Sequence, residues 1–237
     1  MDHVELRELD IPLRLADFSI EPGKTALMII DMYNRATNRN FGFGKRAKEI
    51  GVEKELDYYY HRLEKTVIPN LSKLLNACRD EEIEVIHVTI GSLTLDGRDA
   101  GWRYRSYKML SRGIKELEII EPLLPLPNEI VIKKTTSSAF SSTRADRILR
   151  NLGIEYLIIG GVVSGNCVES TVRDGCDRDF KIYILEDACA GLTEESHQFS
   201  MSYLHFNYAI VKNTQEVLSE IDQKWKSKPL SQKSKNT

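Results

Sequence analysis

The 237-residue sequence has no excess of charge of either sign, because 33 lysines and arginines stand against 35 aspartates and glutamates. The net charge of −2 provides no basic surface for a phosphate backbone or an anionic bilayer, so we expect neither a nucleic-acid nor a membrane partner. No apolar run approaches the roughly 18 residues of a membrane-spanning helix, and residues 1–18 contain early acids and no signal-peptide core. We therefore expect a cytoplasmic protein.

Cysteine is scarce as well. The four cysteines, Cys78, Cys167, Cys176 and Cys189, show no CxxC spacing and are too few to build a disulfide framework in a chain of this length. We expect reduced thiols, any one of which could act as a nucleophile. Hydrophobic residues make up 41% of the chain and charged residues 29%, a balance that favours one compact domain over a disordered or fibrous chain.

The apolar residues gather in short continuous runs, a pattern typical of strands buried on both faces of a parallel sheet. The runs are 25–32, 83–91, 128–134, 155–163 and 180–188, with a weaker one at 207–212. Between these runs lie segments whose apolar residues have helical spacing. The clearest example has apolar residues at steps of three or four, at Leu63, Val67, Leu71, Leu74 and Cys78.

Strands that alternate with helices predict an α/β fold. We expect a doubly wound, mainly parallel six-stranded sheet with helices on both faces, as in Rossmann-like proteins. This sheet would use the chain as one domain over residues 1–223, and the lysine-rich residues 224–237 would form a flexible basic tail. Pro69 should kink or restart the first long helix near Ile68.

Two segments, 33–57 and 92–127, fit no strand and follow strand ends, where open α/β sheets bind their ligands. The second interleaves basic and aromatic residues, among them Arg103 and Tyr104. Such a segment could form a wall of the pocket, as a lid or as a subunit contact, or it could be a solvated loop. The sequence alone favours neither interpretation.

Three reactive side chains fall at or just beyond predicted strand ends: Asp31, Lys134 and Cys167. Cys167 follows a small-residue turn and precedes a predicted helix, so we expect the helix N-terminus and Lys134 to favour its thiolate. Asp31 could accept the thiol proton, and the backbone amides of the turn could hold an oxyanion. Each residue alone has a structural explanation, since buried cysteines usually pack and strand-end aspartates usually cap. The three together point to a catalytic site.

The stretch KTTSSAFSSTRADRILRNLGIEYLIIGGVVSGNCVESTVRDGCDRDFKIYILEDACAG, with TALMIIDM, resembles the isochorismatase-like cysteine hydrolases. That superfamily includes nicotinamidases, N-carbamoylsarcosine amidohydrolases and ureide amidohydrolases. Its first-strand aspartate falls on Asp31, its lysine on Lys134 ahead of the Ser138-Ala139-Phe140 motif, and its nucleophile on Cys167; Lys133 is the less suitable lysine.

The resemblance implies an isochorismatase-like hydrolase fold and a cysteine hydrolase that cleaves a C–N bond of a small amide, ureide or carbamoyl substrate through a thioester. It also implies a cis peptide at Val162–Val163, with the amides of Val163 and Cys167 as oxyanion donors. Phe140 would line the substrate pocket, with aromatic packing against the sheet as the competing explanation. Asp187 would bond to backbone, and the protein would be a homo-oligomer.

The sequence departs from the family pattern after Asp31. Many members have glutamine two residues later, whereas this chain has Tyr33 followed by Asn34, which we expect to border the substrate. Zinc-binding members carry an aspartate and two histidines soon after the first strand, but here the first histidine after Asp31 is His61. We therefore expect no metal and no other cofactor.

Two other functions stay open at this stage. The isochorismatase reaction itself cleaves a vinyl ether and needs no thiol nucleophile. A catalytically silent, oligomeric binding protein on the same scaffold would keep Cys167 only as packing.

Overall fold

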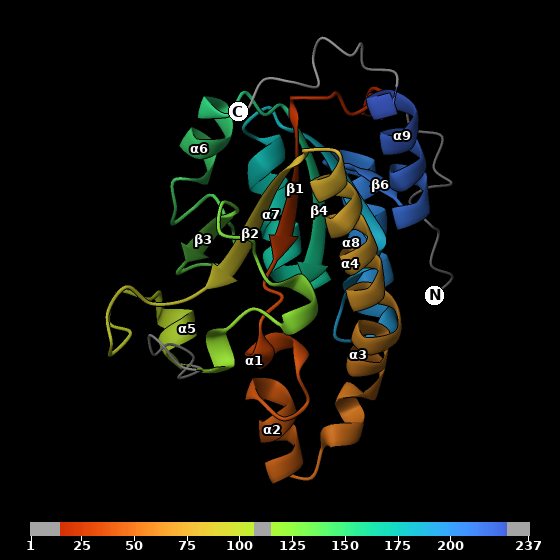
Figure 1. Cartoon of the computed structure of the whole chain (residues 1–237). Coiled ribbons are helices and arrows are strands. Elements are labelled where there is room, and N and C mark those ends of the chain that lie inside the picture. The colour runs from red at the N-terminus through yellow and green to blue at the C-terminus, as the bar shows by residue number, and fades with distance from the viewer. Residues whose placement is uncertain (1–14, 107–114, 227–237) are drawn as a thin grey trace.

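The computed structural model describes residues 15–106 and 115–226. Its six strands form one parallel sheet in the order β3-β2-β1-β4-β5-β6, so the predicted doubly wound architecture is confirmed (Figure 1). The strands are β1 Thr25–Ile30, β2 Glu84–Ile90, β3 Ile130–Lys134, β4 Tyr156–Val162, β5 Lys181–Ala190 and β6 Ile210–Lys212.

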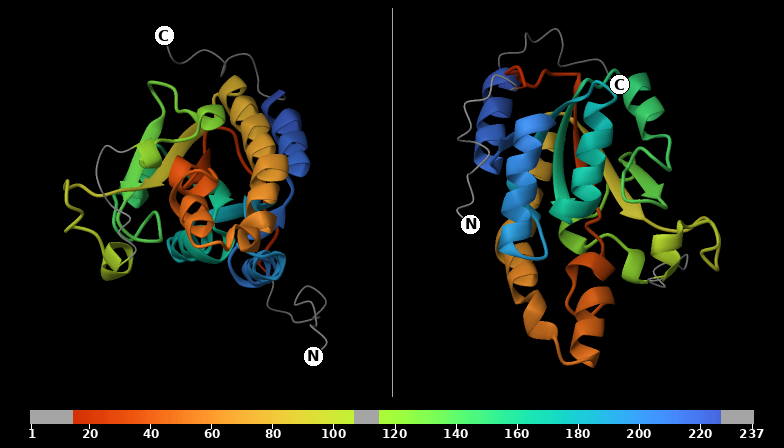
Figure 2. Two further views of the ribbon diagram at one scale, coloured as in Figure 1. Left: turned by 90° about the horizontal axis from the view of Figure 1, so that it is seen from below. Right: turned by 180° about the vertical axis from the view of Figure 1, so that it is seen from behind.

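Helices cover both faces of this sheet. The helices of the described residues are α1 Asn34–Thr37, α2 Gly42–Glu49, α3 Asp57–Arg62, α4 Ile68–Asp80, α5 Trp102–Ser106, α6 Ala145–Asn151, α7 Glu169–Cys176, α8 Glu194–Asn207 and α9 Thr214–Lys226. Short 3₁₀ turns occupy Glu53–Leu56, Lys115–Leu117 and Glu121–Leu123. Helices α4 and α9 lie on one face, and α6, α7 and α8 on the other (Figures 1 and 2).

The strands divide their side chains between two apolar layers. Leu27 and Ile29 of β1 pack toward α4 and α9, whereas Met28 and Ile30 pack toward α6, α7 and α8. Both faces of β1 are therefore buried, and this is why its sequence is a continuous apolar run rather than an alternating one.

The chain around Pro69 forms one long helical path with a local widening. A π-helical turn at Leu63–Val67 joins α3 to α4, which begins at Ile68. In a regular helix the proline ring would crowd the carbonyl group four residues earlier, and here that carbonyl lies within the π-helical turn. The wider π turn provides the space that the ring needs. The predicted restart near Ile68 is confirmed.

The C-terminal helix is longer than expected. Helix α9 ends at Lys226, and Trp225 is fully buried against the α4 side of the sheet. The predicted boundary after residue 223 therefore lies too early, because it would cut off a core residue. The rest of the expected tail, residues 227–237, lies outside the described residues. No helix among the described residues is long and apolar enough to cross a bilayer.

Candidate active site

The carboxyl ends of β3, β1 and β4, with β2 between the first two, bring the predicted catalytic residues together. In the parallel register Ile30 pairs with Val88 and Gly161, and Ile90 pairs with Lys134. Asp31 follows Ile30 directly, and Val162 ends β4, so the side chains that follow these positions share one edge of the sheet. This shared edge is where parallel α/β sheets place their ligand sites.

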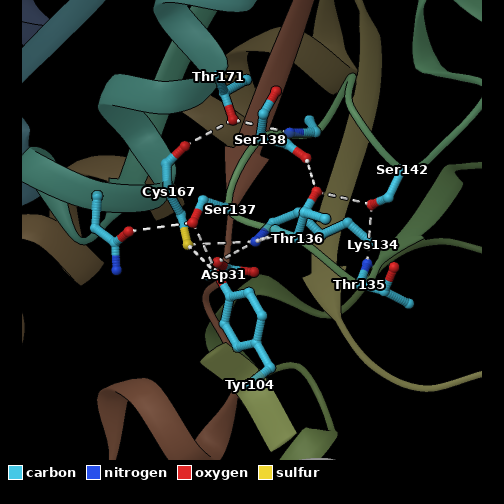
Figure 3. A network of polar contacts seen from close by, with 12 residues as sticks. Asp31, Tyr104, Lys134, Thr135, Thr136, Ser137, Ser138, Ser142, Cys167 and Thr171 are labelled. Carbon is cyan, nitrogen blue, oxygen red and sulfur yellow. Dashed lines mark hydrogen bonds and ion pairs between the residues drawn. The ribbon is translucent and has the colours of Figure 1, made fainter. Parts of the chain in front are cut away.

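Lys134 connects the other two side chains. Its Nζ donates to Asp31 Oδ2 at 2.7 Å and to Cys167 Sγ at 3.3 Å, and also to the carbonyl of Thr136 at 3.2 Å (Figure 3). Lys134 is fully buried and Asp31 is 3% exposed. The neighbouring Lys133 does not join this cluster, and its side chain lies against Gly91.

Asp31 has an uncommon backbone conformation, with φ at +55°. Its amide still continues the sheet by donating to the carbonyl of Val88. The left-handed conformation costs energy for a residue with a side chain, and such residues gather at functional sites. One carboxylate oxygen, Oδ2, is taken by Lys134, whereas Oδ1 is buried with no hydrogen-bond partner within the described part of the chain. Oδ1 is the free acceptor of the site.

The turn after β4 positions Cys167. The Val162–Val163 peptide bond is cis, as the resemblance implied, and a π-helical turn at Ser164–Val168 leads directly into α7. Gly161 makes this turn possible: its φ is +124°, and a Cβ there would lie 2.0 Å from the carbonyl oxygen of Ile30. Cys167 therefore lies in the first turn of a helical segment that begins at Ser164, and the residue is 7% exposed.

The thiol of Cys167 is less acidic than we expected from the sequence. Burial, assisted by the negative charge of Asp31, raises its pKa to about 12, and the ammonium of Lys134 opposes this shift only in part. Lys134 favours the thiolate, as we expected, but burial and the carboxylate of Asp31 outweigh this contribution. Burial alone would lower the pKa of Lys134, but the carboxylate of Asp31 more than offsets this and raises it, so the ammonium stays protonated.

A narrow pocket of about 50 Å³ opens onto Cys167. Its walls come from the ends of β1 and β4, from α1 and α2, and from α5. The lining residues are Asp31, Tyr33, Ala36, Phe43, Ile90, Arg103, Tyr104, Val162, Val163, Asn166 and Cys167. Both segments outside the sheet thus contribute to the pocket, which supports the pocket-wall interpretation of Arg103 and Tyr104.

Tyr104 brings a hydroxyl close to the sulfur. It is 5% exposed, and its Oη lies 3.8 Å from Cys167 Sγ and 3.0 Å from Ser137 Oγ. Ser137 in turn accepts from Arg103 Nη1 at 2.9 Å and donates to Asn166 Oδ1 at 3.3 Å. Neither Ser137 nor Asn166 has a sequence pattern that would have revealed it, apart from proximity to Lys134 and Cys167.

The predicted substrate-binding residues separate into two groups. Tyr33 lines the pocket and is buried, and burial together with Asp31 and Cys167 raises its pKa well above the usual range, so its phenol stays protonated. Asn34 is turned away, because its side-chain amide donates to the carbonyl of Lys115 at 3.0 Å.

Phe140 does not reach the pocket either. Its ring stacks on Phe180 with centroids 5.7 Å apart and belongs to the core beneath α6 and α7. The packing explanation therefore holds for Phe140, and neither it nor Asn34 enters the proposed substrate pocket. Asp187 bonds to backbone as expected: its Oδ1 accepts from the amide of Thr214 at 2.8 Å, at the start of α9. Within the described ranges no group of three or more metal-ligating side chains is placed to hold a metal ion.

Comparisons with known proteins identify the family of the chain. A family model described as the isochorismatase domain matches residues 25–216, which include all three clustered side chains. The chain belongs to the isochorismatase family. A curated member, the ureidoacrylate amidohydrolase RutB of Acinetobacter baylyi, is 30% identical over 219 residues, covering 84% of each chain.

Solved structures of the isochorismatase family have the same fold. A cysteine hydrolase from Pseudomonas syringae pv. phaseolicola superposes with a TM-score of 0.75 at 25% identity, over 91% of this chain and 100% of that one. An N-carbamoylsarcosine amidase from Thermoplasma acidophilum gives a TM-score of 0.62 at 23% identity, over 81% of this chain and 96% of that one. The six-stranded parallel sheet is therefore the isochorismatase-like hydrolase fold.

Proposed function

We propose that the protein is a cysteine-dependent hydrolase that cleaves a C–N bond of a small amide, ureide or carbamoyl compound through a thioester. The observation that carries this proposal is the position of Lys134 Nζ, 2.7 Å from Asp31 Oδ2 and 3.3 Å from Cys167 Sγ at the base of a pocket. The similarity to a protein named ureidoacrylate amidohydrolase supports the same bond type.

Acylation begins with the neutral thiol. Because the pKa of Cys167 is about 12, the sulfur needs a base in place, and the free Oδ1 of Asp31 supplies the acceptor. The thiol proton passes to Asp31 while sulfur attacks the substrate carbonyl carbon, whose π electrons move onto oxygen. The tetrahedral intermediate then collapses, the C–N bond breaks, and Asp31 returns the proton to the departing amine or ammonia.

Deacylation reverses these roles with water. Asp31 takes a proton from a water molecule that attacks the thioester carbonyl, and the C–S bond breaks as the acid product forms. The sulfur recovers a proton, which restores the starting state. Lys134 stays charged throughout, so it stabilises the anionic sulfur, and the amides of Val163 and Cys167 are the proposed oxyanion donors.

Two substitutions test the assigned roles. Cys167→Ala removes the nucleophile and Asp31→Asn removes the base, and each should lower kcat/KM by about 10³-fold or more. Circular dichroism should show that both variants stay folded; the melting temperature of Asp31→Asn should fall, because the buried ammonium of Lys134 loses its counter-charge. Ammonia release from a panel of primary amides, ureides and carbamoyl amino acids is the assay. Lys133→Ala is the matched control and should retain activity, because that lysine lies outside the cluster.

The same assay separates the alternatives. Neither a vinyl-ether hydrolase nor a silent binding protein would release ammonia from any compound of the panel. A vinyl-ether hydrolase would instead cleave a vinyl-ether substrate and keep that activity in Cys167→Ala. Acid quenching followed by mass spectrometry should find an acyl adduct on Cys167 with slow substrates. The speed of alkylation at neutral pH is a poor discriminator, because a thiol with a pKa of about 12 reacts slowly even in an active enzyme.

A further inference from the structure

The nucleophile turn, Ser164–Val168, is bonded at its first residue to helix α8. Ser164 is fully buried, and its Oγ lies 2.8 Å from Nδ1 of His197, which is also fully buried and belongs to the first turn of α8. Helix α8 approaches the turn at a second point, because a Cβ at Gly165 would lie 2.9 Å from the hydroxyl oxygen of Ser200. The nucleophile turn therefore packs directly on α8.

Arg62 fixes the imidazole ring of His197 from the other side. Its Nε donates to the carbonyl of Cys189 at 2.9 Å and its Nη2 to the carbonyl of Glu186 at 2.6 Å, both on β5. The same Nη2 lies 2.8 Å from Nε2 of the ring. Burial and the charge of Arg62 lower the pKa of His197 to about 4, so the ring is neutral at pH 7. Because a guanidinium only donates, Nε2 accepts, the ring proton is on Nδ1, and Nδ1 donates to Ser164 Oγ.

A small displacement of the nucleophile turn would separate the sulfur from its partners. Cys167 follows Ser164 by three residues, and its Sγ accepts from Lys134 Nζ at 3.3 Å. The thiol must also stay within reach of Asp31 to lose its proton. Misplacing a reacting group by about 1 Å can lower a rate about 100-fold. None of the pocket-lining residues of the described chain belongs to α3 or α8, so these helices can affect the reaction only through the turn.

We infer that His197 is a positioning residue that acts on the reaction through Ser164. The hydrogen bond from Nδ1 keeps the nucleophile turn in the conformation that places the Cys167 sulfur beside its proton acceptor. Arg62 contributes by fixing the tautomer of the ring that can donate this bond. The inference rests on the proposed function for the role of the sulfur, but the order of the turn can be measured without turnover.

Two substitutions of His197 separate the two ends of its ring. Asparagine places an amide N–H near the position of Nδ1, so His197→Asn keeps a donor for Ser164 and loses the contact with Arg62. Glutamine places its amide near the position of Nε2, so His197→Gln keeps an acceptor for Arg62 and loses the donor to Ser164. Both variants lose buried ring atoms, so a purely structural role predicts lower stability in both and no difference in kcat between them.

We expect kcat for ammonia release to fall about 10- to 100-fold in His197→Gln and about 3-fold or less in His197→Asn, with KM within about 3-fold of the wild type in both. Amide hydrogen exchange in peptides that cover residues 160–172, followed by mass spectrometry, should be faster in His197→Gln than in His197→Asn or the wild type. Ser164→Ala removes the acceptor with little change of volume and should reproduce the His197→Gln results. In the Ser164→Ala background, His197→Gln should have little further effect on kcat.

Gln198→Ala is the matched control, because Gln198 is the exposed neighbour of His197 on α8, and it should change neither kcat nor exchange. Equal loss of kcat in His197→Asn and His197→Gln, wild-type kcat in Ser164→Ala, or wild-type exchange of the turn in both His197→Gln and Ser164→Ala would each overturn the inference. Faster exchange in these two variants without ammonia release by the wild type would instead overturn the proposed function alone.

Discussion

At the scale of single residues, the hydroxyl of Tyr104 has two competing partners. It lies 3.0 Å from Ser137 Oγ, the better hydrogen-bond distance, and 3.8 Å from Cys167 Sγ. A neutral thiol is a weak acceptor, whereas a thiolate or an anionic sulfur in the transition state is a strong one. Tyr104 is therefore placed to shift its donation toward sulfur as negative charge develops there.

Tyr104→Phe tests this role by removing one oxygen and keeping the ring. We expect alkylation of Cys167 by iodoacetamide, followed by peptide mass spectrometry across pH, to slow about 3- to 10-fold at each pH below the thiol pKa, because the thiolate loses a donor. Ser137→Ala is the contrasting variant: it removes the other partner of Tyr104, so alkylation should be unchanged or faster. Slowing of equal size in both variants would indicate a general disturbance of the pocket instead.

Some residues of the site could be predicted from the sequence, and others could not. Asp31, Lys134 and Cys167 could be predicted because each adjoins a strand end, and parallel strands bring their ends together. The orientations of Asn34 and Phe140 could not, since each depends on a tertiary partner, the carbonyl of Lys115 and the ring of Phe180. The raised pKa of the thiol follows from burial, which spacing along the chain does not reveal.

At the scale of elements, three helical segments meet behind the nucleophile turn. Arg62 of α3 donates to the carbonyls of Glu186 and Cys189 at 2.6 and 2.9 Å, and its Nη2 lies 2.8 Å from Nε2 of His197 on α8. Because the guanidinium only donates, His197 Nε2 accepts, and the proton is on Nδ1. Nδ1 then donates to Ser164 Oγ at 2.8 Å, at the start of the turn that carries Cys167.

His197 makes the stability of this arrangement depend on pH. Burial and the charge of Arg62 lower its pKa to about 4, from about 6.5 in the unfolded chain. Between these values the unfolded state binds more protons, so stability falls as pH decreases through that window, by about 3 kcal/mol in total. His197→Gln should flatten the unfolding free energy between pH 6.5 and 4 in urea titrations. His87, whose pKa burial also lowers, contributes to the remaining slope, and carboxyl groups with a lowered pKa such as Glu129 contribute toward pH 4.

The control for this prediction is Gln198→Ala. Gln198 follows His197 on the same helix but is exposed, so its removal should leave the pH dependence of stability intact. A His197→Gln protein with the full wild-type slope between pH 6.5 and 4 would contradict the assignment. The three-helix contact itself was beyond sequence reasoning, because Arg62, Ser164 and His197 are far apart along the chain and belong to no periodic pattern.

At the scale of the whole molecule, the reactive edge and the main packing lie in different parts of the sheet. The catalytic cluster occupies the carboxyl ends of β1, β3 and β4. Helix α9 runs along one face of the sheet (Figure 1), and Trp225 near its end is buried. The arrangement of a central sheet between two helical layers could be predicted, because the buried strands of a parallel sheet have continuous apolar sequences. The end of α9 could not be predicted, because Trp225 is a single buried aromatic residue between two lysines, in a segment that is otherwise polar. Self-association stays a prediction, which sedimentation measurements test.

Trp225→Ala separates stability from chemistry. Removing a fully buried indole should lower the unfolding free energy by about 3–5 kcal/mol, a large share of the total for a single domain, measured by urea denaturation. Below its own melting temperature the variant should keep the wild-type kcat/KM, because Trp225 belongs to the packing layer of α4 and α9 and does not line the pocket. Gln223→Ala, an exposed neighbour on α9, should alter neither quantity. Loss of activity in folded Trp225→Ala protein would show that the packing of α9 affects the catalytic edge of the sheet. This would contradict the prediction that α9 contributes only to stability.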